Sequence, residues 1–115
     1  MNEFQGDDYK VTYDPTTATV TCQGAFRLYG EAGYESLAEV LDQVADQRVP
    51  LITLNLKELE FLNSSGVNTI SKFIIKVRND RISQVLIIGN PNINWQMKSL
   101  KNLQRLMPTL QVRFE

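Results

Sequence analysis

The sequence contains no histidine and only one cysteine, Cys22. Histidine is the usual general base and the commonest metal ligand, so its absence excludes Ser–His and Cys–His nucleophile systems. A single cysteine excludes an intrachain disulfide, and without histidine a zinc site is not expected. Phosphate-binding loops of the GxxxxGK[ST] and GxGxxG types are also absent. We therefore expect no catalytic residues, no metal and no cofactor.

Long apolar runs and strong net charge are missing as well. The run Val85–Ile88 is far shorter than the roughly 20 residues that a membrane-spanning helix needs. The N-terminal segment MNEFQGDDYK is polar and acidic, unlike a signal peptide. The net charge of −1 gives no bulk attraction to nucleic acid or to an anionic membrane. These features predict a cytoplasmic protein that binds another protein, with no nucleic acid partner and no membrane span.

The remaining composition is that of a globular chain. Of 115 residues, 43% are hydrophobic and 22% are charged. A chain of this size buries roughly two-thirds of its unfolded surface, which is enough for one core. We predict a single domain over residues 1–115.

Two alternating segments open the chain. YKVTY (9–13) and ATVTC (18–22) flank DPTT, a segment with turn chemistry, and together they predict an antiparallel hairpin. Gly24 is expected to end the second strand. The following segment AFRLYGEAG (25–33) is predicted to be a loop.

Helical and strand-like patterns then alternate. Apolar residues at helical spacing predict helices over 34–45, 67–77 and 95–107. Short apolar segments predict three strands. Residues 57–62, which include Glu58 and Glu60, are predicted to be a connection after the first of these strands. The three strand segments are LITLNL (51–56), VLII (85–88) and LQVRF (110–114). This order predicts an α/β fold: a mixed sheet of about five strands, with an N-terminal antiparallel hairpin, packed with about three main helices.

The junction Asn63-Ser64-Ser65-Gly66 precedes the second predicted helix. Ser64 or Asn63 fits the N-cap position, where a side-chain oxygen accepts a hydrogen bond from a first-turn amide. The same position suits a phosphoacceptor, because a helix N-terminus favours negative charge. Capping and phosphorylation are compatible, since both use the same helix-end amides.

The stretch LITLNLKELEFLNSSGVNTI (51–70) resembles the central signature of the STAS domain family. That signature is an apolar strand, a short connection, Asp-Ser-Ser/Thr-Gly and an apolar helix. ATVTCQGAF (18–26) resembles the family's second strand, and the segment from VLIIGN to the C-terminus resembles its last strand–helix–strand unit. The resemblance covers nearly the whole chain and implies a role like that of the anti-sigma factor antagonists, in signalling and transcription regulation.

The resemblance also implies specific functional residues. Ser64 corresponds to the serine that a partner anti-sigma factor of the serine kinase type phosphorylates, with Ser65 as second choice. The dephosphorylated form binds the partner, and the phosphorylated form does not. The implied partner-binding residues are Arg27, Leu28, Tyr29, Asn63, Ser64, Ser65, Gly66 and Val67.

Asn63 departs from the family pattern, which has aspartate there. Asparagine keeps the capping oxygen and loses the charge. This difference favours a divergent member with its own partner, or an alternative function as a constitutive scaffold or assembly subunit that is never phosphorylated. A small enzyme or ligand-binding protein is the least favoured class, given the missing histidine and phosphate loop.

Overall fold

The computed structural model describes residues 2–115. Its strands are β1 (Asn2–Gln5), β2 (Tyr9–Asp14), β3 (Thr19–Phe26), β4 (Leu51–Leu62), β5 (Gln84–Gly89) and β6 (Gln111–Phe114). Its helices are α1 (Gly30–Gly33), α2 (Glu35–Asp46), α3 (Ser64–Asp80) and α4 (Asn94–Asn102), followed by the short 3-10 helix η1 (Leu103–Arg105).

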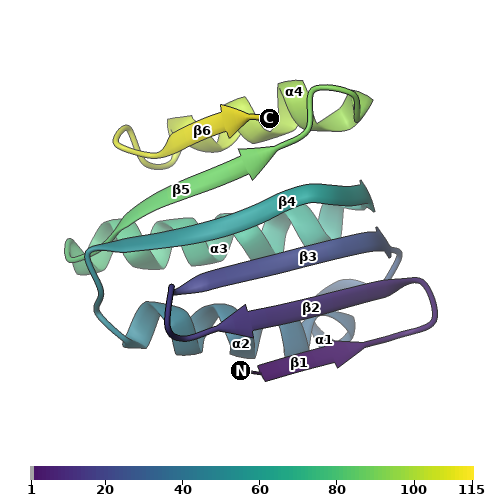
Figure 1. Ribbon diagram of the computed structural model, residues 1–115, viewed down its shortest axis with the longest axis horizontal. Coiled ribbons are helices and arrows are strands. Elements are labelled where there is room, and N and C mark those ends of the chain that lie inside the picture. The colour runs from purple at the N-terminus through teal and green to yellow at the C-terminus, as the bar shows by residue number, and fades with distance from the viewer. Residues whose placement is uncertain (1) are drawn as a thin grey trace.

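The strands form one mixed sheet, in the order β1-β2-β3-β4-β5-β6 (Figure 1). The β1–β2 and β2–β3 pairs are antiparallel, and the remaining neighbours are parallel. The predicted mixed α/β fold and its hairpin are therefore confirmed. The sheet has six strands where about five were predicted, because β1 adds an edge strand whose Phe4 pairs with Val11 and packs against the core.

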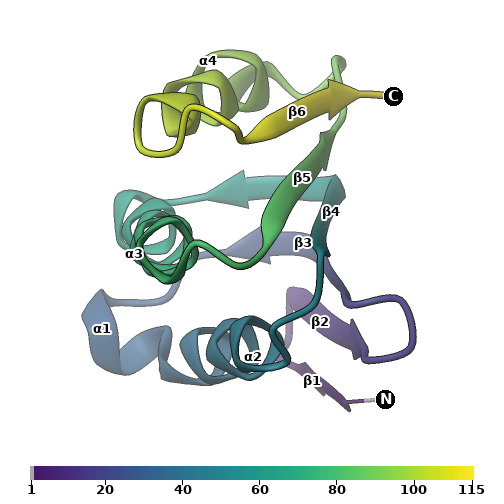
Figure 2. The same ribbon diagram turned by 90° about the vertical axis from the view of Figure 1, so that its left-hand side faces the viewer.

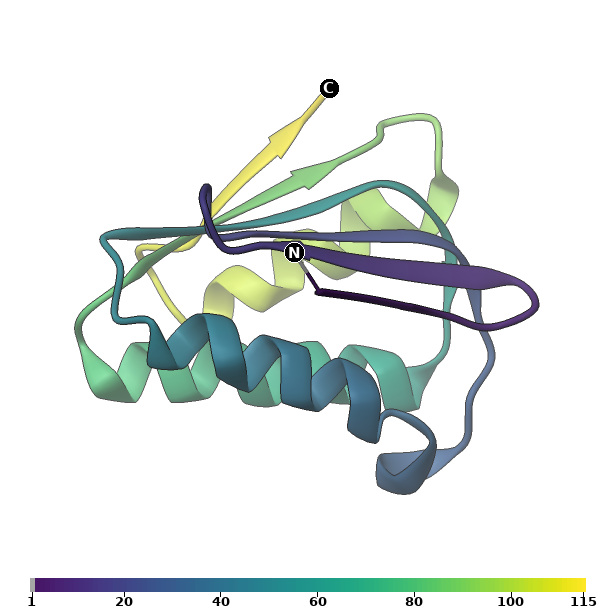
Figure 3. The ribbon, with the colours of Figure 1, turned by 60° about the horizontal axis from the view of Figure 1, so that its bottom comes forward.

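The helices cover one face of the sheet, as Figures 2 and 3 show. The core lies between the two layers. Ile52, Leu54 and Leu56 of β4 reach it from the sheet, and Leu41 and Ile74 reach it from α2 and α3. On the opposite face, alternating residues such as Thr21 and Asn55 remain partly exposed. This alternation is typical of a sheet with one packed and one wet face.

Strand β3 does not end at Gly24, as predicted, but continues to Phe26. Gly24 has a φ of 90°, and a Cβ there would lie 2.2 Å from the backbone oxygen of Asp8. The glycine therefore permits a register shift against β4 within the strand. The predicted loop 25–33 is also partly wrong, because Gly30–Gly33 forms α1.

Residues 57–62 are not a connection but the second half of β4. Glu58 and Glu60 are exposed while Leu59 and Leu62 are buried, so this half-strand keeps an inward apolar side. The third predicted helix divides into α4 and η1. Because residues 57–62 belong to β4, this strand ends one residue before Asn63, the cap of α3.

Two kinds of feature are missing from residues 2–115. None of the helices in this range is long and apolar enough to cross a membrane. Within the same range, no group of three or more His, Cys, Asp or Glu side chains is arranged to hold a metal ion.

Candidate functional site

Asn63 caps helix α3. Its backbone is extended (φ −82°, ψ 177°), and its Oδ1 accepts a hydrogen bond from the backbone N–H of Gly66 at 3.1 Å. Ser64 is therefore the first helical residue and not the cap. Such a cap stabilises a helix by roughly 1 kcal/mol because it satisfies an otherwise unpaired amide.

The Asn63 side chain makes two further hydrogen bonds. The Tyr34 hydroxyl donates to Oδ1 at 2.7 Å, and Nδ2 donates to the backbone oxygen of Leu28 at 2.7 Å. With the amide reversed, its NH2 group would face the Gly66 N–H and both backbone bonds would be lost. The network therefore fixes the orientation of the amide. A single side chain joins the loop after β3, the start of α2 and the start of α3.

This network gives a physical reason for asparagine at this position. An ionised aspartate could accept the bonds from Gly66 and Tyr34, but it has no proton to donate to the Leu28 oxygen. Two oxygens would then face each other at the distance of a hydrogen bond. At neutral pH the Leu28 oxygen is therefore matched by an amide and not by a carboxylate.

Tyr34 supplies the donor that the sequence analysis missed. Its ring is buried, and its hydroxyl lies 2.7 Å from Asn63 Oδ1 and 3.1 Å from the backbone oxygen of Phe26. Burial raises the pKa of Tyr34, a shift that a backbone hydrogen bond from Leu28 opposes. A protonated hydroxyl is what the contact with Asn63 requires. In the sequence Tyr34 is indistinguishable from any apolar helix residue.

Ser64 is exposed and Ser65 is partly buried. Among residues 2–115, the Ser64 hydroxyl makes no hydrogen bond, while the backbone oxygen of Ser65 accepts one from the Thr69 hydroxyl at 3.0 Å. Helix α3 has no acidic residue in its first turn. Ser64 therefore offers a free hydroxyl beside the positive end of a helix.

Gly66, the residue after these two serines, is buried. A Cβ at Gly66 would lie 2.2 Å from Leu62 Cδ1 and 2.9 Å from the Tyr34 hydroxyl oxygen. The glycine thus lets α3 begin directly against the end of β4. Val67 is partly buried and packs against the core, and its N–H donates to the backbone oxygen of Asn63 at 3.0 Å.

The loop after β3 lies at the same end of the molecule as the start of α3 (Figure 3). Tyr29 is 89% exposed, whereas Leu28 packs against the core. The Arg27 guanidinium carbon lies 5.0 Å from the centre of the Phe61 ring, and Phe61 is 40% exposed. Sequence reasoning did not include Phe61 in the site. The feature that could have indicated it is an aromatic residue two positions before the helix cap.

We call these residues together the Ser64 surface. It comprises Arg27, Leu28, Tyr29, Phe61, Asn63, Ser64, Ser65, Gly66 and Val67. It combines two exposed aromatic rings, a free hydroxyl on the first residue of a helix, and an arginine over one of the rings. Exposed aromatic and arginine side chains are the residues that contribute most to protein interfaces.

Comparison with known proteins identifies the fold. No protein-family model matches the chain, and no curated protein does. A chain from the complex of the diguanylate cyclase SiaD with its activator SiaC, from Pseudomonas aeruginosa, superposes with a TM-score of 0.74 at 9% identity, covering 99% of this chain and 98% of that one. An anti-sigma factor antagonist from Mycobacterium paratuberculosis gives 0.69 at 14% identity, covering 95% and 88%.

A third similar structure is the Bacillus cell fate determinant SpoIIAA in its phosphorylated form. It has a TM-score of 0.56 at 19% identity and covers 93% of this chain and 92% of that one. At these identities the likeness concerns the fold. The chain has the STAS-like fold that the resemblance at residues 51–70 implied.

Proposed function

We propose that residues 1–115 form one cytoplasmic, non-enzymatic domain that regulates a partner protein by docking through the Ser64 surface. The proposed switch is phosphorylation of Ser64, with Ser65 as the second choice. The proposed partner is an anti-sigma factor of the serine kinase type. The observation that carries the proposal is the free, exposed hydroxyl of Ser64 on the first residue of α3, on a surface that also exposes 89% of Tyr29.

The position of Ser64 suits a switch that changes binding without changing the fold. Phosphorylation adds about −1.5 to −2 charges. At a helix N-terminus such a charge is favourable, by about 0.3–1 kcal/mol for an exposed group. The same charge, on a surface that also exposes Tyr29 and Phe61, has to be desolvated when a partner covers that surface. The modified domain therefore stays folded and binds less tightly.

The similar structures support this kind of function. They include an anti-sigma factor antagonist, SpoIIAA in a phosphorylated form, and SiaC, which is the activator of a diguanylate cyclase. STAS-like chains thus include both a phosphorylated regulator and one that binds an enzyme. For this chain we favour the kinase-type partner, because its Ser-Ser-Gly segment follows the antagonist pattern.

A constitutive scaffold is the second candidate. It would use the Ser64 surface without phosphorylation. The observation in its favour is Asn63, which places no carboxylate beside the serine and whose amide is committed to Leu28 at 2.7 Å.

Intact-mass measurement of the protein purified from its native cells tests the two candidates. A phosphorylated fraction that maps to Ser64 supports the switch. An unmodified mass in every growth state supports the scaffold. A pull-down with the wild type, Ser64→Ala and Ser64→Asp from the same cells then identifies the partner and its dependence on charge.

A further inference from the structure

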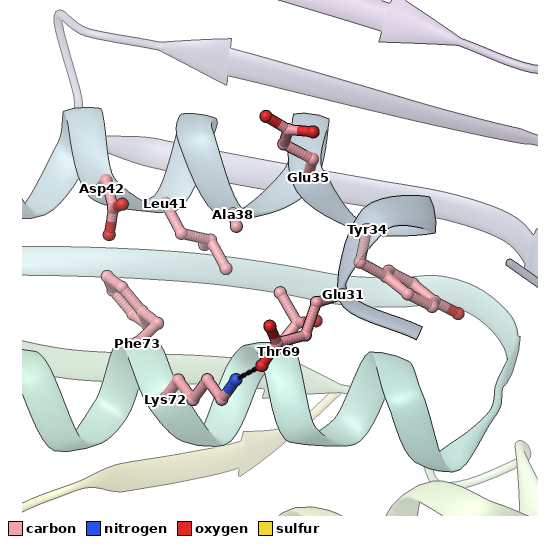
Figure 4. Close-up of a pocket in the computed structure, with 9 residues that line it drawn as sticks. All are labelled: Glu31, Tyr34, Glu35, Ala38, Leu41, Asp42, Thr69, Lys72 and Phe73. Atoms are coloured by element: carbon pink, nitrogen blue, oxygen red, sulfur yellow. Dashed lines mark hydrogen bonds and ion pairs between the residues drawn. The ribbon is translucent and has the colours of Figure 1, made fainter. Parts of the chain in front are cut away.

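A small apolar notch lies between α2 and α3, close to the Ser64 surface. Its apolar lining consists of Tyr34, Ala38, Leu41 and Phe73 (Figure 4), and we call it the α2–α3 notch. Tyr34, Leu41 and Phe73 are core residues whose outer edges line the notch. Ala38 keeps it open, because any larger side chain at that position would enter the space.

Ion pairs from α3 to α1 and to α2 flank the notch. Lys72 pairs with Glu31, as the dashed line in Figure 4 shows. One turn further along α3, Lys76 pairs with Asp42 at 3.5 Å and with Asp46 at 3.3 Å. Exposed ion pairs of this kind are weak because water screens them. They link α3 to α1 and α2, yet an incoming charged group can displace them.

The size of the notch limits what it can hold. Its volume is about 270 Å³. Pockets for small molecules and cofactors measure roughly 300–1,000 Å³ and enclose most of the ligand. The α2–α3 notch is smaller than that range and open on one side. It suits one apolar side chain inserted from a partner's surface.

The rim determines the charge of such a partner. Residues 30–46, which form α1 and α2, contain no lysine or arginine. They contain five acidic residues, and three of these line the notch: Glu31, Glu35 and Asp42. The facing side of α3 supplies Lys72 and Lys76, so acidic groups are in excess. Glu35 makes no ion pair with any residue in 2–115. An incoming lysine or arginine would find an acidic partner there.

We propose that the α2–α3 notch is a docking site for a basic segment of a partner protein, which inserts one leucine, methionine or phenylalanine side chain over Tyr34 and Phe73. This inference rests on the proposed function and extends the Ser64 surface. Tyr34 connects the two sites, because its ring lines the notch while its hydroxyl donates to Asn63 at 2.7 Å. A partner that fills the notch therefore contacts the same tyrosine that positions the cap of α3.

The test uses two labelled amphipathic peptides with identical leucine spacing, one with lysine and one with glutamate at its polar positions. Backbone amide shifts of the whole protein are followed by NMR during titration at low salt. The lysine peptide is expected to shift amides around Ala38, Leu41 and Phe73 and to lose affinity as salt is added. The glutamate peptide is expected to produce no shifts there.

Matched variants locate the binding. Ala38→Trp fills the notch and is expected to weaken binding of the lysine peptide at least about tenfold. Ser36→Trp places the same side chain on an exposed position of α2 that does not line the notch, and it should bind like the wild type. Glu35→Lys reverses one charge on the rim and leaves Ala38 in place, and it should also weaken binding, which keeps the test valid if Ala38→Trp does not fold.

Three results would overturn the notch proposal: equal binding of both peptides, amide shifts centred elsewhere, or equal affinity of Ala38→Trp and Ser36→Trp. The peptide titration needs neither the partner protein nor a modified Ser64. Failure at the notch is thereby distinguished from failure of the Ser64 switch, which is measured with the partner protein.

Discussion

Asn63→Asp tests whether this position requires an amide. The substitution preserves size and the oxygen that caps α3. It removes only the donor that reaches the Leu28 oxygen at 2.7 Å and adds one negative charge. We expect the variant to be less stable than the wild type, even though an acidic residue usually improves a helix N-terminus.

The magnitude follows from two opposing contributions. Leaving the partly buried Leu28 oxygen unpaired costs about 1–3 kcal/mol. The added charge at the N-terminus of α3 returns about 0.3–1 kcal/mol. The net loss is about 1–2 kcal/mol, which lowers the Tm by roughly 4–8 °C for a chain of this length.

Urea unfolding at pH 7, followed by the fluorescence of Trp95, measures this loss. Asn68→Asp is the matched control, because Asn68 is exposed on the same helix and the substitution adds the same charge. The control should stay within about 0.5 kcal/mol of the wild type. Once protonated, the carboxyl introduced by Asn63→Asp could donate to Leu28, so the folded variant binds its proton more tightly than the unfolded chain. The deficit should therefore be full at pH 7 and shrink as the pH falls toward 4.

Equal stability of Asn63→Asp and the wild type at pH 7 would refute this account of the cap. So would a deficit of the same size in Asn68→Asp, because the charge alone would then explain the loss. A deficit that grows on acidification would show that the carboxyl does not replace the amide as a donor.

Two further predictions concern buried positions. Gly66→Ala should destabilise the fold by about 1–2 kcal/mol, because overpacking against Leu62 costs about 1–3 kcal/mol and the higher helix propensity of alanine recovers only part of it. The control Asn68→Ala should be as stable as the wild type. If Gly66→Ala and Asn68→Ala are equally stable in urea, the close approach of α3 to β4 is contradicted. Burial raises the pKa of Cys22 to about 12, so a thiol reagent at pH 8 should react with it only after unfolding; labelling at the same rate with and without urea would show that β3 does not bury the thiol.

The repeating patterns in the sequence predicted most of the fold. Alternation gave the β2–β3 hairpin, and helical spacing gave α2 and α3. Strand β1 was not predicted because its sequence NEFQ has only one apolar residue and so shows no alternation. It lies at the edge of the sheet, where one inward side chain is enough to hold a strand. The second half of β4 was not predicted as a strand because glutamate is uncommon in strands. Glu58 and Glu60 both lie on its exposed side.

Only the parts of the candidate site that depend on neighbouring residues could be predicted from the sequence. Asn63 and Ser64 follow from their place before an apolar helix. The contact between Asn63 and Leu28 spans 35 positions and uses a backbone oxygen. No side chain in the sequence therefore predicts it. The α2–α3 notch likewise depends on how two helices pack, and Tyr34 belongs to both features.

The partner's affinity for the Ser64 variants is the measurement that tests the proposed switch most directly. Titration calorimetry with the purified partner should give similar Kd values for the wild type and Ser64→Ala, and a Kd at least about tenfold weaker for Ser64→Asp. Ser64→Asp should be as stable as the wild type, since an acidic first turn favours α3, so weaker binding would not reflect unfolding. If Ser64→Asp binds the partner as tightly as Ser64→Ala does, a charge switch at this surface is contradicted.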